Sequence, residues 1–152
     1  MVILTAIDLE QAPERPISVG YDLATAYDDT LVVLSVMTES EYDDRIQSRE
    51  ELPDEFDNQF TPDQAAQSIS SEVRSVVNRV VGDEHGDRVE TRGGIGDPAP
   101  TIVGAADELD PRYVVVGGRK QAPAKQAIFG SVSHEVMRQA DQPVVTLVEE
   151  SD

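Results

Sequence analysis

Two glycine-containing segments in the last third of the chain have the composition of a phosphate-binding site. The first is Gly117-Gly118-Arg119-Lys120, and the second is Gly130-Ser131-Val132-Ser133. Glycine lets a backbone approach a ligand closely, and the free N–H groups at the start of a helix attract anions. These segments therefore predict a phosphate site. The plainer alternative is that Gly130 makes a turn and Ser131 caps a helix, with no ligand involved.

The same part of the chain is distinguished by its charge. The protein has 152 residues, 30 of them acidic and 12 basic, and its net charge is −18. Residues 111–134 contain no aspartate or glutamate but include four basic residues, namely Arg112, Arg119, Lys120 and Lys125. This window carries +4, so the rest of the chain carries −22. An anionic ligand is therefore expected here rather than elsewhere on the surface.

The overall composition excludes several classes of partner. A chain with a charge of −18 repels nucleic acid and anionic lipid, so we expect neither as a partner. The longest apolar runs, around Leu31–Val36 and Tyr113–Val116, are too short to span a membrane. Residues 1–6 lack the basic region and cleavage pattern of a signal peptide, and there is no cysteine for a disulfide. We therefore predict a cytoplasmic protein.

The basic residues also indicate the solvent in which the protein works. Only two of the 12 basic residues are lysines, at positions 120 and 125. An acid-rich, lysine-poor surface is typical of proteins in multimolar salt, where screening limits self-repulsion to a range of about 3 Å. We favour a halophilic source over general acidity.

Short apolar runs alternate with helical patterns along the chain. The predicted strands are Val2–Asp8, Leu31–Met37, Tyr113–Gly117 and Val144–Val148, with a weaker, alternating one at Arg88–Arg92. Continuous Val- and Ile-rich runs are typical of parallel strands that are covered on both faces. Helical periodicity covers Pro16–Ala26, Pro62–Val81, a segment that opens at Asp97-Pro98, and Ser131–Ala140.

Two of the helix starts carry specific signals. Thr61 precedes Pro62, and Gln64 completes a capping box, while Gly82 ends the same helix. Ala66, Ile69, Val73, Val76, Val77 and Val80 form its apolar stripe. Asp97 is expected to cap the next helix, in which Ile102, Val103, Ala106 and Leu109 face inward.

The order of these elements predicts an α/β fold, an open doubly wound parallel five-stranded sheet with helices on both faces. We expect one Rossmann-like domain over residues 1–152. In such sheets ligands bind beyond the carboxyl ends of the strands, where the strand order reverses. The residues that follow the predicted strands are therefore candidates for the site: Asp8, Thr38, Gly93 and Gly117.

The segment Thr38–Pro62 is predicted to be a long irregular loop. It contains nine acidic residues against Arg45 and Arg49. One interpretation is a mobile lid over a ligand site, and the other is a solvated, salt-adapted loop with room for a helical turn.

The spacing from Gly117 to Gly130-Ser131 resembles the Gly-x-x-Gly-x9-Gly-Ser/Thr signature of the universal stress protein family. Val114–Val116 before the signature and Gln142–Val145 after it also resemble the family, and so does Asp8. The resemblance covers essentially the whole chain and is least constrained in residues 38–62. It implies an open five-stranded parallel sheet, commonly dimeric, and in one branch of the family a bound ATP.

The resemblance also implies roles for individual residues. Asp8 and the backbone of Val36 would contact adenine, and Gly117 and Arg119 would border the ribose and phosphates. The phosphates would lie on Gly130, Ser131, Val132 and Ser133, with Mg²⁺ or Mn²⁺ bridging their oxygens.

Lys120 stands where the family signature has its second glycine, and Leu9 and Glu10 replace the small residues that often follow the aspartate. If that glycine is needed for a positive φ or a close approach, Lys120 damages the site. If the backbone accepts lysine, its ammonium adds a phosphate partner. The first hypothesis is thus an ATP-binding stress-response protein, and the alternative is an ATP-independent interaction or dimerisation module.

No segment supplies an evident catalytic base, so we expect at most slow ATP hydrolysis and no dedicated enzyme. Gly94–Ala99 matches a dinucleotide fingerprint, but Pro98 removes an N–H group that a pyrophosphate would use, and we interpret it as a turn. An oxidoreductase or nucleotidyl transferase is therefore the least favoured class. We interpret His134 as a surface or capping histidine, and His85 as part of a polar turn that makes a poor metal site. We interpret Val144–Val148 as an edge strand that pairs in a homodimer.

Overall fold

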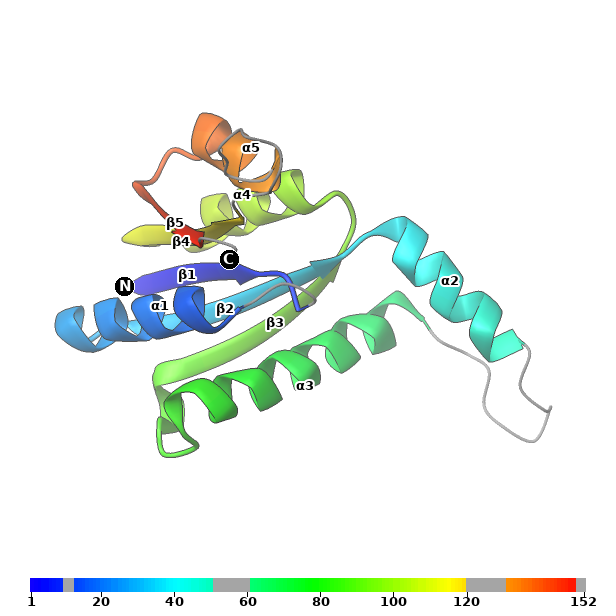
Figure 1. Ribbon diagram of the computed structural model, residues 1–152, viewed down its shortest axis with the longest axis horizontal. Coiled ribbons are helices and arrows are strands. Elements are labelled where there is room, and N and C mark those ends of the chain that lie inside the picture. Colours follow the sequence, from blue (N-terminus) through cyan, green and yellow to red (C-terminus); the bar gives the residue numbers. More distant parts are fainter. Residues whose placement is uncertain (10–12, 51–60, 120–130, 150–152) are drawn as a thin grey trace.

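A five-stranded parallel sheet lies between two layers of helices in the computed structural model, which describes residues 1–9, 13–50, 61–119 and 131–149 (Figure 1). The strands are β1 (Val2–Ile7), β2 (Thr30–Met37), β3 (Val89–Ile95), β4 (Tyr113–Arg119) and β5 (Val144–Glu149). The helices are α1 (Glu14–Tyr27), α2 (Glu39–Glu50), α3 (Pro62–Val81), α4 (Pro98–Leu109) and α5 (Ser131–Gln139), with a short 3₁₀ turn, η1, at Gly86–Arg88.

The strand order is β3-β2-β1-β4-β5, which confirms the predicted doubly wound sheet. β1 pairs with β2 on one side, where Ile7 lies opposite Ser35, and with β4 on the other, where Ala6 lies opposite Val116. The chain therefore winds outward from β1 in both directions. The order reverses between β1 and β4, so ligands of this fold are expected at the carboxyl ends of these two strands.

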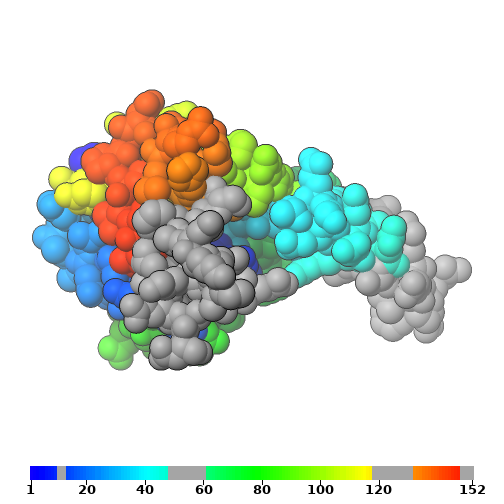
Figure 2. All heavy atoms as spheres, turned by 45° about the horizontal axis from the view of Figure 1, so that its top comes forward, coloured from blue at the N-terminus to red at the C-terminus, as the bar shows by residue number. Residues whose placement is uncertain are grey.

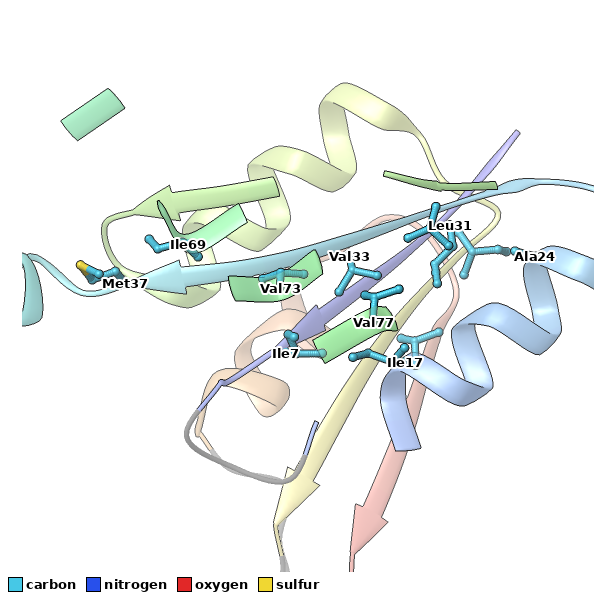
Figure 3. Close-up of a cluster of buried hydrophobic side chains, with 12 residues drawn as sticks. Ile7, Ile17, Ala24, Leu31, Val33, Met37, Ile69, Val73 and Val77 are labelled. Atoms are coloured by element: carbon cyan, nitrogen blue, oxygen red, sulfur yellow. The ribbon is translucent and has the colours of Figure 1, made fainter. Parts of the chain in front are cut away.

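The sheet is buried on both faces, which explains why its strands read as continuous apolar runs. Side chains alternate along β1: Ile3 and Ile7 belong to the cluster beneath α1 and α3, and Leu4 and Ala6 to the cluster beneath α4 and α5. Figure 3 shows the first cluster, in which side chains from α1, α3 and the sheet meet. Its core includes Ile17, Ile69, Val73 and Val77, all at most 2% exposed.

The helix α3 has the predicted bounds and the predicted capping box. The Thr61 hydroxyl accepts a hydrogen bond from the Gln64 N–H at 3.1 Å, and Gln64 Oε1 accepts one from the Thr61 N–H at 3.3 Å. Ala65 rather than Ala66 is the fully buried alanine, because it lies four residues before Ile69, in the same row of the helix as Val73 and Val77.

The prediction of an irregular loop over residues 38–62 is wrong for residues 39–50, which form α2. This helix stands out from the body of the protein (Figures 1 and 2). Thr38 Oγ1 accepts a hydrogen bond from the Glu41 N–H at 3.1 Å, and Glu39 and Glu41 in the first turn complement the helix dipole. Its exposed acidic side chains favour the solvated-surface interpretation over a lid. Residues 51–60 of the predicted loop lie outside the described part of the chain.

The strand β3 is longer than predicted because it continues through Gly93 and Gly94 to Ile95. A Cβ at Gly93 would overlap the Ala66 carbonyl oxygen and lie 2.7 Å from the Ile69 Cβ, so only glycine lets α3 approach this closely. Asp97 occupies the predicted N-cap of α4 but makes no side-chain capping bond. Instead, the Thr101 hydroxyl donates to the Asp97 carbonyl at 2.8 Å.

No helix in the described part of the chain is both long and apolar enough to cross a lipid bilayer.

The amino edge of the sheet carries an ion pair that crosses β1. Asp29, just before β2, has a side chain only 3% exposed, and its Oδ2 lies 2.8 Å from Nε of Arg112, just before β4. The Arg112 guanidinium also lies 4.2 Å from the centre of the Tyr27 ring. The hydrogen bond from Arg112 holds the pKa of Asp29 below the usual range of a carboxyl group, although burial alone would raise it.

Because its folded-state pKa is lowered, ionised Asp29 stabilises the fold at pH values above the ordinary pKa of aspartate, which is about 4. This contribution disappears as the pH falls through the folded-state value. We expect Asp29→Asn to lower the urea midpoint at pH 7, and the gap between variant and wild type to shrink below about pH 4. Urea titrations between pH 3 and pH 7 measure that gap, and a gap that is constant with pH would contradict the role given to this pair.

Candidate functional site

Three of the predicted site residues lie side by side at the carboxyl edge of the sheet. Ile7 is opposite Ser35 across β1 and β2, so Asp8 follows at the level of Val36. Ala6 is opposite Val116 across β1 and β4, so Gly117 lies one residue beyond that pair. Asp8 is exposed, whereas Val36 is half-buried, with its side chain packed against the cluster beneath α4 and α5. The backbones of three neighbouring strands therefore meet where the strand order reverses.

The first turn of α5 is fixed to this edge by one side chain. Ser133 is 4% exposed, and its hydroxyl donates a hydrogen bond to the Gly117 carbonyl oxygen at 2.6 Å. Val132 is half-buried against the cluster beneath α4 and α5. Ser131 is the first residue of the helix. The amino end of α5, with its free N–H groups and the positive end of its dipole, thus lies beside the carboxyl end of β4.

The basic window of the sequence does not form one surface. Arg119 ends β4 at the site, but Arg112 precedes the same strand at its opposite end, roughly 20 Å away for a strand of this length. Arg112 is paired with Asp29 there, so the expectation that its charge contributes to the phosphate window is wrong. The fold separates the two arginines because a strand carries its ends to opposite edges of the sheet. Lys120, Lys125 and Gly130 lie outside the described residues.

Pro16 is a residue of the site that the sequence did not single out. A Cβ at Gly117 would lie 3.0 Å from Cγ of Pro16, in the first turn of α1. Gly117 is therefore contacted by α1 on one face of the sheet and by Ser133 of α5 on the other. The sequence could have indicated Pro16, because it lies at the start of the helix after β1, and such a helix begins at the carboxyl edge of the sheet.

The weaker candidates have ordinary surroundings. His85 Nε2 lies 2.7 Å from Asn78 Oδ1, and its Nδ1 lies 3.3 Å from the Gly86 carbonyl oxygen. His134 is exposed on α5. Gly94 lies within β3, and the N–H of Gly96 donates to the Met37 carbonyl at 2.9 Å, so these residues end a strand and turn the chain. Among the described residues no group of three or more His, Cys, Asp or Glu side chains is arranged to hold a metal.

The fold is that of a doubly wound α/β protein whose strand order reverses between β1 and β4. The model of the universal stress protein family matches residues 1–147, and the chain belongs to this family. The stress response protein NhaX of Bacillus subtilis (strain 168) is 33% identical over 79 residues, which are 52% of this chain and 45% of that protein. The match thus spans less than half of the length of NhaX.

Solved structures share the fold over nearly the whole chain. The universal stress protein of Archaeoglobus fulgidus is 24% identical with a TM-score of 0.65, covering 96% of this chain and 97% of that one. A structure of an Archaeoglobus fulgidus universal stress protein in complex with dAMP is 22% identical, with a TM-score of 0.59 and 96% of both chains covered. A universal stress protein in complex with cAMP is 16% identical, with a TM-score of 0.63 and coverage of 97% and 95%.

Proposed function

We propose that this universal stress protein binds an adenine nucleotide, with ATP as the ligand, at the carboxyl ends of β1 and β4. The observation that carries the proposal is the fixed junction at Gly117. Gly117 lies near the carboxyl end of β4, Asp8 follows the neighbouring strand β1, and Val36 belongs to β2 on the far side of β1. Ser133 of α5 donates to the Gly117 carbonyl at 2.6 Å. In the proposed complex the adenine of the nucleotide contacts Asp8 and the backbone of Val36, and its phosphates lie at the amino terminus of α5.

The relatives support an adenine nucleotide as the ligand, but they do not indicate how many phosphates it carries. Two of the solved neighbours carry cAMP or dAMP, which have adenine in common. The backbone N–H groups in the first turn of a helix have no partner within the helix, and those of α5 would suit additional phosphates. We propose Mg²⁺ or Mn²⁺ as a bridge between phosphate oxygens, because such ions are commonly bound through substrate phosphates rather than by a dedicated protein cage.

We propose binding rather than turnover as the role of this site. In this proposal the phosphates lie against backbone N–H groups of α5, which stabilise charge but do not take up a proton from water. The acid-rich composition supports a role in a salt-rich cytoplasm, so nucleotide binding should be measured in high KCl.

The test is calorimetric titration of ATP in high KCl, together with mass spectrometry of small molecules released from the purified protein. We expect binding at or below the millimolar range, or a co-purifying adenine nucleotide. Absence of both at millimolar ATP would overturn the proposal.

The alternative is an ATP-independent interaction module on the same fold, favoured by Lys120 at the second glycine of the signature. Lys120→Gly separates the two functions. Binding that appears only in this variant would favour the interaction module, whereas equal or weaker binding by the variant favours a working site.

We also propose a homodimer that pairs through β5. This strand lies at one edge of the sheet formed by the described residues, and its Val144 and Val145 are only half-buried, whereas their partners Val114 and Val115 on β4 are buried. An apolar strand with an unpaired edge is suited to pairing with a second copy.

We expect Val145→Lys to convert the dimer to a monomer, because it would bring a charged group into a half-buried apolar position of the strand that pairs. Sedimentation velocity of Val145→Lys measures the change. The matched control is Glu90→Lys, which puts the same side chain on the opposite edge strand, β3, and should leave the dimer intact. A dimeric Val145→Lys protein would count against pairing through β5.

A further inference from the structure

Ser133 connects two segments that the sequence separates. It lies in the first turn of α5, and its hydroxyl donates to the carbonyl of Gly117, sixteen residues earlier. The distance of 2.6 Å is at the short end for a neutral hydrogen bond, and Ser133 is 4% exposed, so water competes little for its hydroxyl. This bond joins the end of β4 to the start of α5.

The hydrogen bond commits the only proton of the hydroxyl. A phosphate oxygen is an acceptor, so a side chain contributes to its binding by donating. The Ser133 hydroxyl cannot donate to a phosphate while it donates to Gly117. Its backbone N–H belongs to the first turn, whose N–H groups have no partner within the helix, and we assign the phosphate contact to that group.

Gly117 is held on the other face as well. A Cβ at Gly117 would lie 3.0 Å from Cγ of Pro16 in α1, so α1 packs closely against this point of the strand. Ser133 contacts Gly117 from α5 as well, so the strand meets both helices at this residue.

From this arrangement we propose that Ser133 is a positioning residue: its hydroxyl fixes the amino terminus of α5 against Gly117 so that the backbone N–H groups of α5 face the nucleotide. The inference rests on the proposed nucleotide binding and assigns the side chain a task other than direct contact with phosphate. Loss of the hydroxyl should weaken binding by loosening the helix start, before any ligand is present.

The test compares Ser133→Ala, which removes the hydroxyl, with Ser133→Thr, which keeps it. We expect Ser133→Ala to raise the Kd for ATP about tenfold and Ser133→Thr to stay within about threefold of wild type. The matched control is Ser75→Ala, because Ser75 is an exposed serine of α3 that also donates to a backbone carbonyl, at 3.2 Å. The control should bind like the wild type.

Hydrogen exchange of the nucleotide-free proteins separates positioning from direct contact. We expect faster exchange in residues 117–119 and in α5 for Ser133→Ala alone. Weakened ATP binding with unchanged exchange would overturn the inference in favour of direct contact, and unchanged ATP binding would overturn it as well. If wild type binds no nucleotide, the proposed function fails, and unchanged exchange in Ser133→Ala would then also remove the positioning role.

A melting curve without nucleotide shows whether Ser133→Ala is folded at the temperature of the binding assay. If it is not folded, Ser133→Cys replaces it, because the thiol has nearly the same shape and is a weak donor. That variant should lie between wild type and the tenfold loss, and binding equal to wild type would contradict the role of the hydroxyl.

Discussion

Gly93→Ala should lower the free energy of unfolding by about 3 kcal/mol, a large share of the stability of a domain of this size. The added Cβ would overlap the backbone carbonyl oxygen of Ala66 and lie 2.7 Å from the Ile69 Cβ. A backbone atom cannot rotate away as a side chain does, so α3 must move off β3 along its length. Urea unfolding in high KCl measures the loss.

The matched control is the same substitution in α4. A Cβ at Gly104 meets nothing within 4 Å, and Gly104 is an exposed residue in the interior of the helix. Gly104→Ala should therefore raise stability by about 0.5–1 kcal/mol, because alanine loses less backbone entropy on folding. Equal effects of the two substitutions would contradict the close approach of α3 to β3.

Asp8→Asn should weaken ATP binding by between tenfold and a hundredfold, and should also reduce the preference for ATP over GTP. In the proposed complex the Asp8 carboxylate accepts a hydrogen bond from the adenine amino group, and a hydrogen bond to a charged group is worth about 1.5–3 kcal/mol. Guanine presents a carbonyl oxygen in place of that amino group. A carboxylate repels this oxygen, whereas the side-chain amide of the variant can donate a hydrogen bond to it. Calorimetry with both nucleotides measures the two effects.

Asp22→Asn is the control for charge. Asp22 is an exposed residue of α1, and its replacement removes one negative charge without touching the carboxyl edge. It should leave both the ATP affinity and the base preference unchanged. If both variants alter binding equally, overall charge rather than base recognition is responsible.

The sheet and its switch point were predictable because their determinants are local and repetitive. Apolar runs such as Val114–Val116 are continuous since helices cover both faces of the sheet, and the alternation of strands with helices then dictates right-handed parallel crossovers. The capping box at Thr61 was also predictable, because it depends on residues three positions apart.

The helix α2 was not predictable from periodicity because it buries almost nothing. Half-buried Tyr42 and Ile46 are surrounded by charged and polar residues, and a helix without an apolar stripe looks like a solvated loop in the sequence. The carboxyl end of β3 was also not predictable, because this strand continues through Gly93 and Gly94. Glycine has a low strand propensity, and its use at Gly93 depends on the nearness of α3 in space.

The candidate site was predictable in its location and less so in the tasks of its residues. The glycine motif and the acid-free window both indicated the end of β4. Charge along the sequence could not show that Arg112 lies at the opposite edge, paired with Asp29. Nor could it show that Ser133 donates to Gly117, because that bond depends on how α5 packs across the end of the strand.

The most direct test of the nucleotide site is a residue-by-residue comparison of amide NMR spectra with and without ATP in high KCl. The proposed site predicts shift changes at Asp8, Val36, Gly117 and residues 131–133, and none around Asp29 and Arg112 at the amino edge. Spectra that do not change at millimolar ATP, or changes concentrated at the amino edge, would contradict nucleotide binding at the carboxyl ends of β1 and β4.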